Sequence, residues 1–226
     1  MHTRQVLAAA GLLALAGLHA QPAAPWQQEY RDAEATGDHV IALWQFDTGK
    51  EAEDASGHGH GLVLRGRSAW SPEGRFGGCL ESFRVDPKVE DKPVGATTRD
   101  RDTLSPEGAF TLELWLKPKE ELAEQPTAFL VDKKFFHYAK AEPRANTDYA
   151  LYLQRHSGGG HVLTATLGFG KDSVWASSKP VTLEAGRWVH LAYSYDGAGT
   201  SRFYVDGAYA GRVVHEGRGA VTPGTN

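Results

Sequence analysis

The amino-acid sequence predicts an all-β protein folded as an antiparallel β-sandwich or jelly roll. From residue 39 onward, short segments alternate apolar and polar residues with a period of two, as in 110–118 and 187–196. Glycine-rich and Asp-Gly turns separate these segments, for example at 157–160 and 206–207. Many short strands joined by such turns, without a long helical period, are typical of a sandwich.

The expected strands cover most of the chain. They lie at 39–47, 61–66, 75–83, 96–100, 110–118, 127–133, 148–155, 161–168, 187–196, 201–207 and 209–214. Before them, Trp26, Tyr30 and Ala33 have helical spacing and Gly37 follows, so a short helix is expected there. Residues 215–226 show no alternation, so we expect an irregular tail and a sandwich that lacks its final strands.

Length and composition indicate one domain with an ordinary soluble surface. A chain of 226 residues, 41% of them hydrophobic and 23% charged, can bury one large core. The net charge of -4 and the scattered basic residues argue against nucleic acid as a partner. Cys79 is the only cysteine, so an internal disulfide is excluded and a buried, inert thiol is expected.

The first twenty residues have the pattern of a signal peptide. Arg4 precedes an apolar run from 6 to 18, which is short for a membrane span, and cleavage is expected after Ala20. An uncleaved membrane anchor is the alternative. The expected organisation is a signal peptide at 1–20, a linker with a short helix at 21–38 and the jelly-roll domain at 39–226. Such a protein would be secreted, periplasmic or on the cell surface, with no membrane insertion after cleavage.

Four stretches, in order, resemble the laminin-G-like jelly-roll family of the concanavalin A-like lectin/glucanase superfamily. They are Ala42–Gly61 with its Trp-Gln-Phe-Asp and Asp-Ala-Ser-Gly motifs, FTLELWLKP at 110–118, GRWVHLA at 186–192 and Tyr-Val-Asp-Gly at 204–207. The resemblance implies a concanavalin A-like jelly roll that recognises carbohydrate or an extracellular protein without catalysis. Family members usually carry a further strand pair after this hairpin, and the sequence has no counterpart of it.

The strand expected at 110–118 is the best candidate for catalytic carboxylates. Glycosidases of this fold place two or three acidic residues at alternate positions of one strand. Alternation puts Thr111, Glu113, Trp115 and Lys117 on one face, and Trp115 holds the position of the second acid. We therefore expect no enzyme. The alternative is a polysaccharide hydrolase or lyase of the same fold.

A second strand could complete a binding surface on this face. Alternation in 187–196 puts Trp188 and His190 on one face. If both strands share a sheet, the surface presents these candidate ligand-binding residues: Glu113, Trp115, Trp188 and His190. The alternative for these residues is an aromatic layer covered by loops, with His190 bonded to a backbone carbonyl. The alternative for the function is a structural or adhesive surface module without a small ligand. The long charged loops at 87–101 and 132–144 are weaker candidates.

The glycine-rich stretch from 47 to 60 is the candidate metal site. Asp47 and Asp54 offer the hard oxygen ligands that calcium prefers, and calcium is the one cofactor that this pattern favours. The alternative is a turn in which Asp54 accepts hydrogen bonds from the amides of Ser56 and Gly57. The two histidines in this stretch lack an obvious third ligand for zinc.

Overall fold

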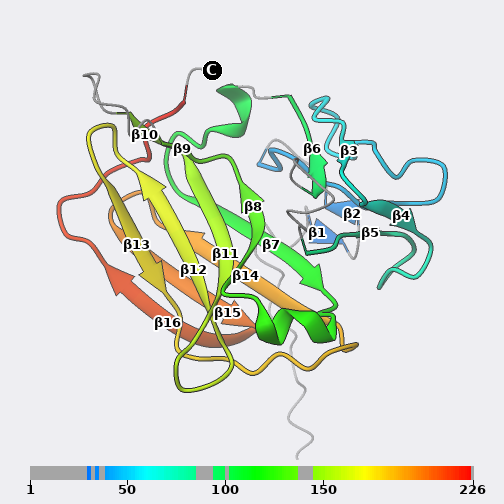
Figure 1. Ribbon diagram of the computed structural model, residues 1–226. Helices are drawn as coiled ribbons and strands as arrows, with labels where there is room; N and C mark the ends of the chain where they lie inside the picture. The colour runs from blue at the N-terminus through cyan, green and yellow to red at the C-terminus, as the bar shows by residue number, and fades with distance from the viewer. Residues whose placement is uncertain are drawn as a thin grey trace, which may run out of the picture.

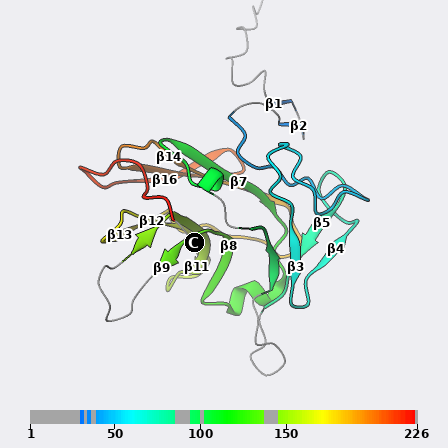
Figure 2. The same ribbon diagram turned by 90° about the horizontal axis from the view of Figure 1, so that it is seen from above.

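The computed structural model describes residues 30–31, 34–35, 39–84, 94–99, 102–136 and 145–224. Two four-stranded antiparallel sheets stack face to face and form its body (Figures 1 and 2). The described residues contain no α-helix, so the predicted all-β sandwich is confirmed. No helix in this part of the chain has the length and apolar character needed to cross a membrane.

The two sheets are built from eight strands, each pairing with its neighbours in antiparallel register. The front sheet has the order β13-β12-β11-β8, made of β8 (Thr127–Asp132), β11 (Tyr149–Arg155), β12 (His161–Gly168) and β13 (Ser173–Ser177). The back sheet has the order β16-β15-β14-β7, made of β7 (Phe110–Leu116), β14 (Val189–Tyr195), β15 (Thr200–Val205) and β16 (Ala208–Val214). A bulge in the pairing of β11 with β8 leaves Leu130 without a register partner.

The core lies between the sheets and follows from the period-two pattern. Alternate residues of each strand point inward, and these are mainly leucine and aromatic side chains. The front sheet contributes Leu151, Leu153, Leu163, Ala165 and Leu167, and the back sheet contributes Leu191, Tyr193, Tyr195 and Phe203. Burial of each large apolar side chain stabilises the fold by roughly 1.5–3 kcal/mol.

Short ribbons and turns accompany the sandwich. Two of the ribbons lie beside β7 (Figure 1) and pair β3 (Val63–Arg65) with β6 (Gly95–Thr97) and β4 (Ala69–Ser71) with β5 (Cys79–Glu81). The others pair β9 (Phe135–Phe136) with β10 (Asn146–Thr147) and β1 (Tyr30–Arg31) with β2 (Glu34–Ala35). Two 3-10 helices, η1 (Asp102–Leu104) and η2 (Glu120–Glu124), precede β7 and β8.

The strand predicted at 39–47 does not form. The backbone amide of Leu43 donates to the carboxylate of Asp54, and its carbonyl accepts from Ala55, so both groups bond to a loop and not to a strand. Phe46 has a φ of 59°, which interrupts an extended backbone. The expected unpaired edge beside this strand is therefore wrong as well.

The helix predicted before the domain is also wrong where the chain is described. Tyr30 pairs with Ala35 and Arg31 with Glu34, which is a short antiparallel ribbon. Trp26 and Gly37 lie outside the described residues, as do the expected signal peptide and its cleavage site. Helical spacing alone did not decide the local structure of so short a segment.

The C-terminal tail is irregular, as predicted, but it is firmly attached to the sandwich. Residues 215–224 form no strand. Val221 is only 3% exposed and belongs to the core, and the Thr222 amide donates to the carbonyl of Gly168. The carbonyl of Thr222 accepts a hydrogen bond from the amide of Asp148. The tail thus covers one end of the space between the sheets.

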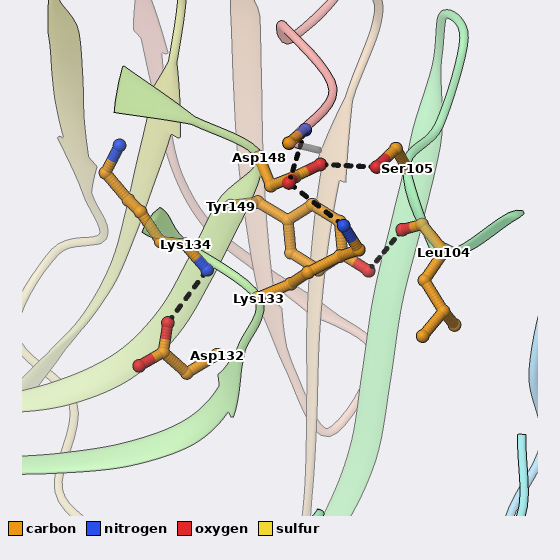
Figure 3. Close-up of polar contacts among 8 residues, drawn as sticks. Leu104, Ser105, Asp132, Lys133, Lys134, Asp148 and Tyr149 are labelled. Carbon is orange, nitrogen blue, oxygen red and sulfur yellow. Dashed lines mark hydrogen bonds and ion pairs between the residues drawn. The ribbon is translucent and has the colours of Figure 1, made fainter. Parts of the chain in front are cut away.

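A buried carboxylate fixes this end of the sandwich (Figure 3). Asp148 is 1% exposed and accepts hydrogen bonds from the Ser105 hydroxyl at 2.6 Å and the Gly224 amide at 2.8 Å. The Lys133 ammonium lies 3.0 Å from the same carboxylate. Ser105 precedes β7, Lys133 follows β8 and Gly224 follows β16. The side chain of Asp148 therefore connects both sheets and the tail. We call these four residues the Asp148 clasp.

We expect Asp148→Asn to lower the free energy of unfolding by about 3–5 kcal/mol. The substitution removes the negative charge that lies 3.0 Å from the Lys133 ammonium, whose side chain is only 10% exposed. Asparagine tolerates the φ of 55° at this position, so backbone strain adds little. Urea unfolding of both proteins measures the difference. Asp172→Asn is the control, because its ion pair with Arg218 is exposed and should contribute little to stability. Equal losses in the two variants would contradict the role of the clasp.

Candidate functional site

The two strands expected to share a sheet are direct neighbours in the back sheet. Trp115 lies opposite His190, and Glu113 lies opposite Ala192. The rings of Trp115 and His190 have centroids 5.2 Å apart, and Glu113 Oε2 lies 3.4 Å from His190 Nε2. Trp188 precedes β14, with the Lys117 ammonium 6.0 Å from its ring centroid. The expected juxtaposition is confirmed, while ligand binding by these residues stays a prediction.

A loop from the β4–β5 ribbon covers part of this face. The Arg75 guanidinium lies 4.3 Å from the ring centroid of Trp115, and the Phe76 ring meets the same ring edge to face at 5.7 Å. Trp115 is consequently only 37% exposed, whereas Phe76 is 65% exposed. Protein partners thus cover part of the Trp115 ring, and the rest of the ring stays exposed.

The surroundings of Glu113 favour its ionised form. The hydrogen bond with His190 lowers the pKa of Glu113, and the imidazolium charge adds to this effect and outweighs the opposing effect of burial. A glycosidase general acid needs the opposite shift, together with a second carboxylate on the other side of the scissile bond. The next outward position of β7 holds Trp115. Glu113 therefore orients His190 and does not have the surroundings of a proton donor.

The candidate calcium loop is organised by the carboxylate of Asp54. Its Oδ1 accepts from the amides of Leu43 and Ser56 and from the Ser56 hydroxyl, and its Oδ2 accepts from the amide of His60. Burial raises the pKa of Asp54, but these hydrogen bonds outweigh burial and lower the pKa. Both carboxylate oxygens of Asp54 thus face N–H or O–H donors where a cation would have to bind, so the arrangement does not fit calcium. This is the turn given as the alternative, with His60 in place of Gly57.

Asp47, the second calcium candidate, lies apart from these donors. Its carbonyl accepts from the amide of Lys50 in a turn, and its carboxylate lies beside Gly77. Within the described parts of the chain, no group of three or more His, Cys, Asp or Glu side chains is placed to hold a metal ion. Calcium binding at this loop stays a prediction that the geometry does not support.

The outer face of the front sheet carries an aromatic surface that the sequence analysis did not identify. Tyr152 of β11 lies opposite Phe129 of β8, with ring centroids 5.1 Å apart. Trp175 of β13 lies opposite Thr166 of β12. Phe129 is 61% exposed and Trp175 is 57% exposed, so two large rings face solvent from the two edge strands. We call Phe129, Tyr152, Thr164, Thr166 and Trp175 the front-sheet platform.

Hydroxyl groups lie between the two exposed rings. The Tyr152 hydroxyl is 3.2 Å from Thr166 Oγ1, and Thr164 Oγ1 is 2.9 Å from the Ser177 hydroxyl. Three inter-strand steps separate β13 from β8, so Trp175 and Phe129 lie about 14–16 Å apart. The platform therefore has an exposed aromatic ring at each end, and the Tyr152, Thr164 and Thr166 side chains between them are buried.

The sequence contained part of the signal for this platform. Ala128 and Leu130 pack on the core, so alternation directs Phe129 outward, and the same pattern directs Tyr152 outward between Leu151 and Leu153. Trp175 was missed because the strand of residues 173–177 was not predicted. That segment is short and has serine at both ends. Its outward tryptophan between Val174 and Ala176 is the pattern that would have revealed it.

We expect Glu113→Gln to cost less than about 1 kcal/mol of stability, because the ion pair is half exposed. The folded-state pKa of Glu113 lies below its usual value of 4.5, so the stabilisation is complete above pH 4.5. It is lost as the pH falls through the lower, folded-state pKa. The difference in urea midpoint between wild type and variant should therefore shrink from pH 6 to pH 3. A difference that grows on acidification would refute this account.

We expect Asp54→Asn to lower stability by about 1–3 kcal/mol, because the amide group places N–H donors against backbone donors. Calcium and a chelator should both leave the melting temperature of the wild type unchanged. Differential scanning calorimetry measures both effects, with magnesium at equal ionic strength as the control. A calcium-dependent rise in the wild type that disappears in the variant would show a cation site here.

Comparison with known proteins gives the same fold. A laminin G family model, described as the concanavalin A-like lectin/glucanases superfamily, matches residues 94–226, which is more than half of the chain. One similar solved structure is domain 4 of the GH43 extracellular arabinanase from Geobacillus stearothermophilus, in complex with arabinotriose. It shows 19% identity over 80% of each chain, with a TM-score of 0.47. No curated protein matches the sequence. The chain belongs to the concanavalin A-like lectin/glucanases superfamily.

Proposed function

We propose that this protein is a non-catalytic carbohydrate-recognition module and that the front-sheet platform is its binding surface. The observation that carries the proposal is the pair of exposed rings, Phe129 and Trp175, on the edge strands of a rigid sheet. Exposed apolar surface that gathers on one face of a protein often marks a binding site. Membership of a superfamily that includes lectins is consistent with this function.

The chemistry of the platform matches that of a sugar chain. A pyranose or furanose ring has an apolar C–H face and a rim of hydroxyls, so it packs on an aromatic ring while its hydroxyls seek hydrogen bonds. Trp175 and Phe129 supply exposed rings, and the buried, mutually hydrogen-bonded side chains of Tyr152, Thr164 and Thr166 form the floor between them. The separation of the two rings suits an oligosaccharide of several units that lies across the strands.

The back-sheet face is less suited to the same task. The ring of Trp115 is covered in part by Arg75 and Phe76, so it offers a sugar less free aromatic surface than Trp175 does. The depressed pKa of Glu113 and the absence of a second carboxylate beside it on β7 support a module without hydrolytic activity. The proposal also includes export, which rests on the signal-peptide pattern of residues 1–20.

The test compares Trp175→Ala and Phe129→Ala with Trp115→Ala. Binding of the intact mature chain to neutral polysaccharides (arabinan, xylan, laminarin and mixed-linkage β-glucan) is measured by affinity electrophoresis and calorimetry. Each front-sheet substitution should weaken binding about tenfold, which corresponds to the loss of one aromatic packing contact. Trp115→Ala is matched in size and lies on the opposite face, and it should change the affinity less than twofold.

Three outcomes would contradict the proposal. If Trp115→Ala abolishes binding while the front-sheet variants bind normally, the binding surface is the back-sheet face. If no polysaccharide binds and the chain instead captures a purified extracellular matrix protein, the module is adhesive. Release of reducing sugar that Glu113→Gln abolishes would show a glycosidase.

A further inference from the structure

The ribbon formed by β3 and β6 encloses a groove that plays no part in either aromatic face. The groove has a volume of about 430 Å³ and is open to solvent. Val63 and Arg65 of β3 line one side, and Thr97, Thr98 and Arg99 line the other. Val63 pairs with Thr97 and Arg65 pairs with Gly95 in antiparallel register, so the backbone frame of the groove is hydrogen-bonded.

The groove is cationic in a protein whose net charge is -4. Of the described residues that line it, two are arginines and none is acidic. Neither Arg65 nor Arg99 forms an ion pair with any residue of the described part of the chain. Arg67, which follows β3, donates to the backbone carbonyl of Arg84. Local positive charge of this kind attracts anions at short range.

The geometry of Arg65 leaves it ready to bind an anion. Its Nε donates to Thr97 Oγ1 at 2.9 Å, which fixes the side chain over the groove and uses one of its five N–H donors. The terminal nitrogens retain the planar arrangement that matches a carboxylate or a sulfate. Its cross-strand partner is Gly95, and no heavy atom lies within 4 Å of the position that a Cβ would take there. An anionic group thus has room beside the guanidinium.

We infer that this groove binds the anionic groups, carboxylate or sulfate ester, of an acidic polysaccharide. The inference rests on the proposed carbohydrate recognition for the class of polymer, and on Arg65, Arg99 and Thr97 for its charge. The platform then packs against sugar rings, and the groove selects chains that carry negative charge. A nucleic acid fits less well, because no aromatic side chain among the described lining residues can stack on a base.

The test uses polymers that differ only in charge. Polygalacturonate is compared with fully methyl-esterified pectin for the carboxylate, and dextran sulfate with dextran for the sulfate ester. The wild type should bind at least one charged polymer more tightly than its neutral counterpart at 50 mM NaCl. The Arg65→Met/Arg99→Met double variant should lose about tenfold in affinity for that polymer, and 0.5 M NaCl should remove the difference.

Arg212→Met is the matched control, because Arg212 is an exposed strand arginine of β16 in the back sheet. It changes the net charge in the same direction and should leave the affinity within twofold. Equal binding by wild type and double variant would overturn the inference, and so would tighter binding of poly-dT that depends on Arg65 and Arg99. Trp175→Ala separates the two proposals: loss of neutral-polymer binding with intact arginine dependence, or the reverse, identifies which of them fails.

Discussion

The buried carboxylate of Asp148 is the interaction on which the arrangement of the two sheets most depends. It binds Ser105 before β7, Lys133 after β8 and Gly224 in the tail, so three separate segments converge on one side chain (Figure 3). The adjacent residues form a second hydrogen bond, in which the Tyr149 hydroxyl donates to the carbonyl of Leu104. Because a buried charge is costly unless it is fully partnered, the clasp specifies one alignment of the sheets.

With the sheets fixed, the alternation of side chains determines what each outer face presents. The core takes the inward leucines, Tyr193 and Phe203, and the outward residues form two different surfaces. On the back sheet, Arg75 and Phe76 pack against the ring of Trp115 and cover part of it. On the front sheet, Phe129 and Trp175 keep most of their surface exposed. This asymmetry is the physical basis for assigning recognition to the front sheet.

The sequence predicted the repeating parts of the structure well and the context-dependent parts poorly. Period-two alternation located β7, β11, β12, β14 and β15, and it also placed Trp115 beside His190. The segment 39–47 has the same alternation but is not a strand, because Asp54 takes the amide of Leu43. No local pattern reports that long-range contact. The Asp148 clasp was missed for the same reason, since its partners lie up to 76 residues from Asp148 in the sequence.

The central claim is that sugar rings pack on the front-sheet platform, and the most direct test is an NMR titration of the intact chain with the best-binding oligosaccharide. The indole N–H resonance of Trp175 should shift in a saturable manner, together with amides of β12 and β13. The indole resonances of Trp115 and Trp188 should stay in place, because the back sheet lies on the other side of the core. Shifts confined to Trp115, Trp188 and the amide of His190 would contradict the account.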